Sequence, residues 1–118
     1  VRKPAPEPEG APDLVIDLPT RPECALLYRL NGDHNPLHSD PAVAARAGFP
    51  RPILHGLATF GMVGRALLRG ACGGDPARFG RMECRFSAPV FPGETIRTEL
   101  WSRDGEAAFR ARVVERDV

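Results

Sequence analysis

The chain has 118 residues, the size of one domain, and carries a formal net charge of +1 at pH 7. Its hydrophobic content of 42% and charged content of 26% are typical of a globular protein. The near-neutral charge and the scattered arginines argue against a nucleic-acid partner, and no apolar run is long enough to cross a membrane. Because the first residues also lack an apolar signal core, we expect a cytoplasmic location.

The three cysteines are Cys24, Cys72 and Cys84. An odd number without a C-x-x-C pair argues against a disulfide framework and against a zinc site. Cys24 and Cys84 occupy apolar positions of strand-like runs, so we expect both to be small buried side chains.

Residues 1–13 are rich in proline, which alternates with charged and small residues. This composition favours extended chain that packs against nothing, and it is typical of a joint between two domains. The sequence therefore predicts a Pro-rich linker over 1–13 and a folded domain over 14–118, with this domain as the second half of a longer protein.

The first apolar segments are short. Residues 14–16 (LVI) indicate a strand, which Pro19 and Pro22 interrupt. Residues 24–30 (CALLYRL) are too few for periodicity to separate strand from helix. The turn formers of 31–33 (NGD) then end this segment.

Two helices follow. Residues 39–41 (SDP) combine a capping side chain with a proline at the first helical position, which predicts a short helix over 42–47. The second helix runs over about 56–69 and is apolar nearly all round, so we expect it to be buried. Gly61 and Gly64 each cost a helix about 1 kcal/mol relative to alanine, which suggests that a sheet curled round the helix approaches them closely.

Beyond the second helix the hydrophobic period changes to two, over 82–88, 96–101 and 107–113. Turn formers at 92–93 and 104–105 separate these segments, which predicts three antiparallel strands, each with one apolar face. An antiparallel sheet wrapped around a long central helix is the plan of the hotdog fold, which belongs to the α+β class. The last strand would leave an open edge, which a missing strand or a second copy would cover.

Asp33, Asn35 and His38 lie in the loop before the short helix, held by Gly32 and Pro36. Loops tied to a rigid scaffold at both ends are where proteins usually place reactive groups. An aspartate and a histidine that converge on one water can share acid and base duties. The asparagine amide supplies donors and acceptors that orient the pair or the substrate.

His55 and Gly56 begin the long helix, where the first N–H groups have no internal partner and lie at the positive end of the helix dipole. Gly56 has no side chain, so a ligand carbonyl can approach its N–H. The helix start is therefore an oxyanion site suited to a thioester enolate, the anion that forms when water adds to an α,β-unsaturated thioester.

Each of these residues also has a purely structural interpretation. Asp33 could cap a turn, His34 and His38 could be solvated loop residues, and His55 could be a satisfied histidine at the helix cap. The three histidines do not favour a zinc site, because Pro36 prevents the helical spacing of histidine ligands and no cysteine is near. We therefore expect no metal.

Two segments of the chain resemble the motif regions of the MaoC-like dehydratase family: YRLNGDHNPLHSDPAVAARAGFPRPILHGLATFG and RFSAPVFPGETIRTELW. The likeness covers roughly 14–114 and is strongest to the (R)-specific enoyl-CoA hydratases, called hydratase 2, and to the C-terminal hotdog of double-hotdog hydratases. The first motif is long and is far more specific than a bare Asp–His spacing.

This resemblance implies roles for individual residues. Asp33 and His38 match the catalytic pair that activates water for syn addition across the double bond, and Asn35 matches the asparagine that helps to form the site. Gly56 matches the glycine whose N–H polarises the thioester carbonyl. Two further residues lie beside these motif positions: Tyr28 and His55.

The implied reaction is the reversible hydration of trans-2-enoyl-CoA to (R)-3-hydroxyacyl-CoA in fatty-acid metabolism. It needs no cofactor beyond the CoA or carrier-protein phosphopantetheine that the substrate carries, and the acyl chain would lie in a tunnel lined by the central helix. The implied partner is a second hotdog, in a homodimer or as a preceding domain. Family members carry one more strand after the position of Val118, which this chain lacks.

Three alternatives remain open from the sequence. A hotdog thioesterase would carry a carboxylate on or beside the central helix, and residues 57–69 contain neither Asp nor Glu. A non-catalytic acyl-thioester-binding subunit would be expected to lose the Asp33–His38 pair, which is intact here. A dehydratase acting on carrier-protein-bound acyl groups would use the same residues, because the machinery runs in both directions.

Overall fold

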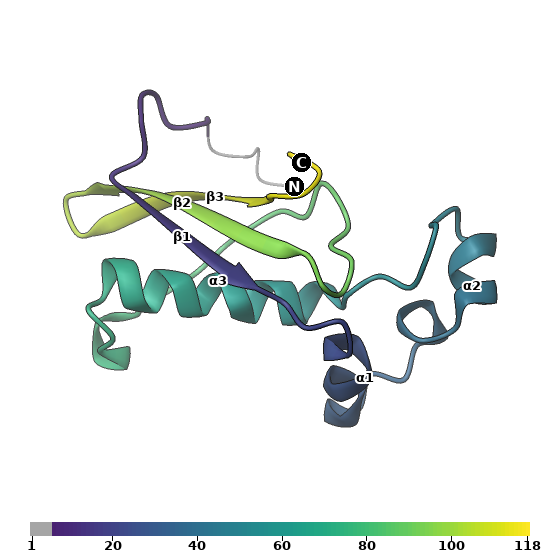
Figure 1. Cartoon of the computed structure of the whole chain (residues 1–118). Helices are drawn as coiled ribbons and strands as arrows, with labels where there is room; N and C mark the ends of the chain where they lie inside the picture. Colours follow the sequence, from purple (N-terminus) through teal and green to yellow (C-terminus); the bar gives the residue numbers. More distant parts are fainter. Residues whose placement is uncertain (1–5) are drawn as a thin grey trace.

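The computed structural model describes residues 6–118, and Figure 1 shows their arrangement. The helices and strands are, in chain order, β1 (Leu14–Pro19), α1 (Cys24–Tyr28), α2 (Pro41–Arg46), α3 (Gly56–Ala71), β2 (Thr95–Arg103) and β3 (Glu106–Val113). Short 3-10 turns lie between them at Arg29–Asn31, Pro36–His38 and Pro76–Arg78. Within the described part of the chain, no helix has the length and apolar character needed to cross a membrane.

The strands form one antiparallel sheet in the order β1-β2-β3, and α3 runs along one face of it (Figure 1). Ile16 of β1 pairs with Thr98 of β2, and Thr98 pairs with Ala111 of β3. Asp104 and Gly105 both have positive φ, +40° and +78°, which is the conformation of a tight hairpin turn. The last two predicted strands and the turn between them are therefore confirmed.

The core lies between α3 and the inner face of the sheet. Val63 and Leu67 of α3 pack with Ile96, Leu100 and Val113 of the sheet, and none of the five is more than 6% exposed. Burying a large apolar side chain stabilises a protein by about 1.5–3 kcal/mol, so this layer holds α3 in place. The predicted α+β hotdog fold, with a sheet against one long central helix, is confirmed.

The outer face of α3 is open, against the prediction that the helix is buried all round. Leu57 is 68% exposed and Gly61 is also exposed, whereas Val63, Ala66 and Leu67 are buried. A three-stranded sheet covers only one side of a helix, so the opposite apolar side faces outward.

The glycine of α3 that meets the sheet is Gly70. A Cβ at Gly70 would lie 2.8 Å from Leu14 Cδ2 and 2.9 Å from Ile16 Cδ1. A Cβ at Gly61 would meet nothing within 4 Å, and one at Gly64 would lie 3.6 Å from a single side-chain sulfur. The predicted close approach of a backbone to Gly61 and Gly64 is therefore wrong.

The predicted strand over 82–88 is absent, since residues 81–87 form no regular element. Alternating side chains suggested a strand there, but a strand also needs a hydrogen-bonding neighbour, which local sequence does not specify. Cys84 lies in this segment and is exposed, and Cys24 is half-buried on α1 rather than in a strand. The prediction that both are buried strand residues is wrong.

Part of the Pro-rich leader packs on the outer face of the sheet, where the sequence predicted chain without contacts. Trp101 Nε1 donates to the Gly10 carbonyl at 3.2 Å, and Ser102 N donates to Asp13 Oδ2 at 2.7 Å. The first five positions of the predicted linker lie outside the described residues. Its role as a joint between domains stays a prediction.

Candidate active site

Short-range hydrogen bonds shape the loop between α1 and α2. Gly32 has a φ of +106° and ends the 3-10 turn after α1, a conformation that glycine adopts without strain. Asp33 Oδ1 accepts from Asn35 N at 3.2 Å, and Asn35 Oδ1 accepts from Leu37 N at 3.0 Å. These are Asx-type turns, so Asn35 shapes the loop with its own amide oxygen. A contact of Asn35 with substrate stays a prediction.

His38, at the end of this loop, is held by the segment that leads into α3. Its Nδ1 lies 2.7 Å from the Ile53 carbonyl oxygen. A carbonyl oxygen only accepts, so Nδ1 carries the hydrogen and the neutral ring keeps its lone pair on Nε2. The half-buried ring therefore offers a proton acceptor in a fixed orientation.

His55 is the residue before α3 and is only 1% exposed. Its ring stacks on that of His38, with centroids 3.8 Å apart and planes 25° apart. Its Nε2 lies 3.3 Å from the backbone carbonyl oxygen of Asp33. Burial lowers the pKa of His55 from its ordinary value, so the imidazole stays neutral at neutral pH.

Asp33, His38 and His55 each place one ligand atom within 4.8 Å of the others. Asp33 is exposed and His55 is buried, so the cluster opens to solvent on the aspartate side. A carboxylate and an imidazole at this spacing can hold one water and exchange protons with it. The structure therefore brings the sequence-predicted pair together, while the exposed His34 is not part of the group. A group of this composition could equally hold a metal ion.

Gly56 is the first residue of the 16-residue helix α3, so its N–H lies at the positive end of the helix dipole. A Cβ at Gly56 would lie 3.6 Å from the Phe86 ring, in ordinary van der Waals contact. The alternation over 82–88 predicted that Phe86 lies in a strand. Nothing in the neighbouring sequence indicated its contact with Gly56. The predicted oxyanion site follows directly after the histidine that stacks on His38.

An open cavity of about 480 Å³ lies beside the cluster, between α1 and α3. Tyr28 links the two features, because it lines the cavity and its ring lies 4.7 Å from the His55 ring. In place of an enclosed acyl tunnel, the described residues form a groove that the uncovered face of α3 leaves open. Its walls are mostly apolar: Cys24, Tyr28, Leu54, Leu57, Ala58, Phe60, Gly61, Met62 and Arg65.

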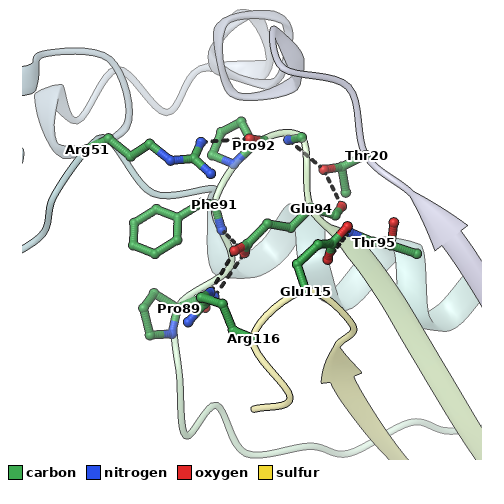
Figure 2. Close-up of polar contacts among 10 residues, drawn as sticks. Thr20, Arg51, Pro89, Phe91, Pro92, Glu94, Thr95, Glu115 and Arg116 are labelled. Carbon is green, nitrogen blue, oxygen red and sulfur yellow. Dashed lines mark hydrogen bonds and ion pairs between the residues drawn. The ribbon is translucent and has the colours of Figure 1, made fainter.

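The segment that leads into α3 is fixed against the turn before β2. Leu54 N donates to the Val90 carbonyl at 2.7 Å. Arg51 Nη1 donates to the Pro92 carbonyl at 2.7 Å (Figure 2). The guanidinium carbon of Arg51 also lies 4.8 Å from the centre of the Phe91 ring, a cation–π contact. This segment carries the Ile53 carbonyl, so the turn supports the orientation of His38.

Glu94 is a buried acid in the same turn, 7% exposed. Its carboxylate accepts from Phe91 N at 2.8 Å and from Arg116 Nε at 2.6 Å (Figure 2). Burial alone raises the pKa of Glu94, but the bonds from Arg116 and Phe91 N outweigh it and hold the pKa below its ordinary value. Sequence reasoning missed Glu94, Arg51 and Arg116, because their partners are distant in sequence.

With this geometry in place, comparison with known proteins identifies the family. Residues 3–118 match the family model described as the MaoC like domain. The chain belongs to this family. The resemblance inferred from the motif segments is therefore confirmed.

Two curated relatives show how much of a longer protein this MaoC-like domain covers. The chain is 53% identical over 119 residues to 3-hydroxyacyl-thioester dehydratase Y of Mycobacterium tuberculosis, covering 98% of this chain and 41% of that protein. It is 48% identical over 110 residues to the peroxisomal enoyl-CoA hydratase 2 of Arabidopsis thaliana, covering 93% of this chain and 36% of that protein. The chain thus spans about two fifths of these relatives' length or less.

Solved structures agree with this assignment. The domain superposes on the MaoC-like dehydratase from Phytophthora capsici with a TM-score of 0.93 at 47% identity, covering 99% of this chain and 41% of that one. Against the full-length peroxisomal multifunctional enzyme type 2 from Drosophila melanogaster the TM-score is 0.95 at 45% identity, covering 100% of this chain and 22% of that one.

Proposed function

We propose that this MaoC-like domain catalyses the reversible hydration of trans-2-enoyl-CoA to (R)-3-hydroxyacyl-CoA. The observation that carries the proposal is the convergence of Asp33 and His38 beside the start of α3, within 4.8 Å of each other. A relative named as an enoyl-CoA hydratase 2, 48% identical over most of the chain, supports the same reaction.

The proposed mechanism divides the chemistry between the loop and the helix start. Asp33 and His38 Nε2 hold one water and take its proton as the oxygen attacks C3 of the enoyl group. Negative charge then develops on the thioester oxygen, where the Gly56 N–H stabilises it. The Asp33–His38 pair then delivers a proton to C2 of the enolate from the same face, which returns the pair to its starting state and makes the addition of the hydroxyl and the hydrogen syn. The reverse sequence eliminates water.

The acyl chain would lie in the apolar groove beside Tyr28 and Leu57, which is continuous with the cluster through the Tyr28–His55 contact. Hydration transfers no electrons between molecules, so the proposal includes no redox cofactor. It includes no metal, because the Gly56 N–H already supplies the polarisation of the carbonyl. The substrate itself carries CoA or a carrier-protein phosphopantetheine.

A second hotdog is the partner we propose, as a second copy in a homodimer or as a preceding domain. The open outer face of α3 and the open groove support this, because a further layer would enclose the acyl chain. We propose a cytoplasmic location, with the peroxisome as the alternative because the relatives from Arabidopsis thaliana and Drosophila melanogaster are both named peroxisomal. Imaging a fluorescent fusion distinguishes the two compartments.

Dehydration of carrier-protein-bound substrates is a second candidate. The relative named 3-hydroxyacyl-thioester dehydratase, 53% identical, favours it. The catalytic residues would be the same, so the two candidate functions differ only in whether the acyl group is carried by CoA or by a carrier protein. A kcat/KM higher for a 3-hydroxyacyl carrier protein than for the matching CoA ester would favour this candidate.

The hydratase proposal is tested with purified protein and a short trans-2-enoyl-CoA, by following the loss of conjugated-thioester absorbance. We expect Asp33→Asn and His38→Gln each to reduce kcat by about 100-fold or more, because acid–base groups contribute about 10²–10⁴-fold. His34→Gln is the matched control, since this exposed neighbour lies outside the cluster and should leave kcat unchanged. Full activity in both cluster variants, or a product of S configuration, would refute the proposal.

A further inference from the structure

His55 is a buried titratable residue that the proposed reaction does not use. It is among the largest fully buried side chains of the chain, at 1% exposure. Its Nδ1 is buried and has no hydrogen-bond partner among residues 6–118. An apolar side chain would fill the same space without leaving a buried nitrogen unpaired. Packing alone therefore does not explain why this position is a histidine.

The contacts of His55 supply that reason. Its ring stacks on the ring of His38 at 3.8 Å, and its Nε2 lies 3.3 Å from the Asp33 carbonyl oxygen. A carbonyl oxygen cannot donate a hydrogen bond, so Nε2 carries the hydrogen and Nδ1 is the unprotonated ring nitrogen. One side chain therefore contacts both members of the proposed pair, through the ring of one and the backbone of the other.

Apart from His55, the two members are linked through Asn35, whose carbonyl accepts from His38 N at 3.1 Å. Asp33 is exposed, and its side chain accepts from Asn35 N within the same loop. His38 is tied to the Ile53 carbonyl, which belongs to a different segment. His55 spans the two, and the Tyr28 ring packs at 4.7 Å from its ring.

We propose that His55 is a positioning residue that sets the distance between Asp33 and His38, by tethering the Asp33 backbone through Nε2–H and supporting the His38 ring. The proposal rests on the proposed hydratase function. His55 acts through its two neighbours and does not touch the reacting atoms. Since burial keeps His55 uncharged, it does not oppose a proton taken up by His38.

Two amide substitutions separate tethering from simple packing. The amide nitrogen of glutamine reaches roughly the place of Nε2, whereas that of asparagine reaches the place of Nδ1. We expect His55→Asn to lower kcat on the order of 100-fold, the effect of a small displacement of reacting groups. His55→Gln should retain about tenfold more activity than His55→Asn, the equivalent of one hydrogen bond. KM should change less than kcat in both.

His55→Leu supplies the stability control. It fills the space without a bare nitrogen, so its unfolding midpoint should equal or exceed that of the wild type while kcat falls as in His55→Asn. Equal kcat for His55→Gln and His55→Asn would overturn the proposal, as would losses of kcat that simply follow losses of stability. All of these variants are made and assayed in the full-length protein.

A measurement on the wild type tests the tether without any variant. Nitrogen NMR of the histidine rings should show His55 protonated on Nε2 and bare on Nδ1, and the opposite tautomer would overturn the proposal. A wild type that does not hydrate enoyl-CoA would instead refute the proposed function. The two failures are therefore distinguishable.

Discussion

The proton chemistry proposed for this site depends on where each imidazole keeps its hydrogen. His38 carries it on Nδ1, facing the Ile53 carbonyl at 2.7 Å. His55 carries it on Nε2, facing the Asp33 carbonyl at 3.3 Å. The stacked rings thus have opposite tautomers, and the lone pair of His55 is buried. Of the two rings, that of His38 is therefore the one that can accept a proton from a water on the exposed side of the cluster.

At the same residues, a metal-free mechanism makes a direct prediction. Asp33, His38 and His55 present ligand atoms within 4.8 Å of one another, a set that zinc could also approach. If the Gly56 N–H polarises the carbonyl, then dialysis against a strong chelator should leave kcat unchanged. Elemental analysis of the dialysed protein is the accompanying control. Activity that is lost on dialysis and returns with added zinc would contradict the metal-free reaction.

Among the secondary-structure elements, those with local signals were predictable from sequence. The cap of α2 is one, since Asp40 Oδ1 accepts from Ala42 N at 2.8 Å. The start of α3 at Gly56 and the hairpin at Asp104 and Gly105 are others. The loop of Asp33 and His38 was found because its motif is long. In each case the determining residues are neighbours in the chain.

What the sequence could not predict depends on partners that are distant in the chain. The alternation over 82–88 suggested a strand, but residues 81–87 form no regular element. No local signal marks Glu94, which is buried and accepts a hydrogen bond from Arg116 beyond β3. The role of His55 was equally undecided, because stacking on His38 is a tertiary contact.

For helix α3, two glycines give opposite predictions. A Cβ at Gly70 would lie 2.8 Å from Leu14 Cδ2 and 2.9 Å from Ile16 Cδ1, so Gly70→Ala must push β1 side chains away. We expect it to lower the free energy of unfolding by about 1 kcal/mol, as overpacking outweighs the gain in helix propensity. Gly61→Ala, with open space around it, should raise that free energy by up to about 1 kcal/mol. Denaturant unfolding measures both, and equal effects would contradict the packing described.

The turn before β2 predicts a dependence of stability on pH. The pKa of Glu94 in the folded chain lies below its ordinary value of 4.5, with Arg116 and Phe91 N as donors that outweigh burial. Such a group stabilises the fold above its unfolded pKa, and this stabilisation is lost as pH falls through the folded pKa. Glu94→Gln should therefore lower the free energy of unfolding by about 2 kcal/mol at pH 7. Below pH 4.5 the free energies of unfolding of the variant and the wild type should approach each other.

An exposed ion pair on the sheet provides the control for the Glu94 prediction. Arg97 and Asp17 form a bidentate pair across β1 and β2, but both side chains are 42% exposed. Asp17→Asn should therefore change the free energy of unfolding by about 0.5 kcal/mol or less. Urea unfolding at a series of pH values compares the two variants. A Glu94→Gln effect as small as that of Asp17→Asn would show that burial adds nothing to this ion pair.

On the scale of the whole molecule, the core is one-sided. The sheet buries Val63 and Leu67 of α3, while the opposite side of the helix exposes Leu57 at 68% beside the open groove. The site lies at the start of this helix, so whatever covers the outer face of α3 would also enclose the substrate. A second hotdog, in another copy or a preceding domain, would supply that cover and finish the groove as a tunnel.

If a second hotdog covers the outer face of α3, a charged residue at position 57 should destabilise the protein. The exposure of Leu57 in this domain alone would predict no such loss of stability. In the protein as its gene encodes it, Leu57→Glu should lower the free energy of unfolding by about 2 kcal/mol, because a charge would enter an apolar interface. Ala45→Glu is the matched control on the exposed side of α2, expected to stay within about 0.5 kcal/mol. Since Leu57 also lines the groove, hydration of a long-chain enoyl-CoA should fall more than that of a short one. Equal stabilities of the two variants would mean that the face of α3 remains open in solution and that the groove binds its acyl chain uncovered.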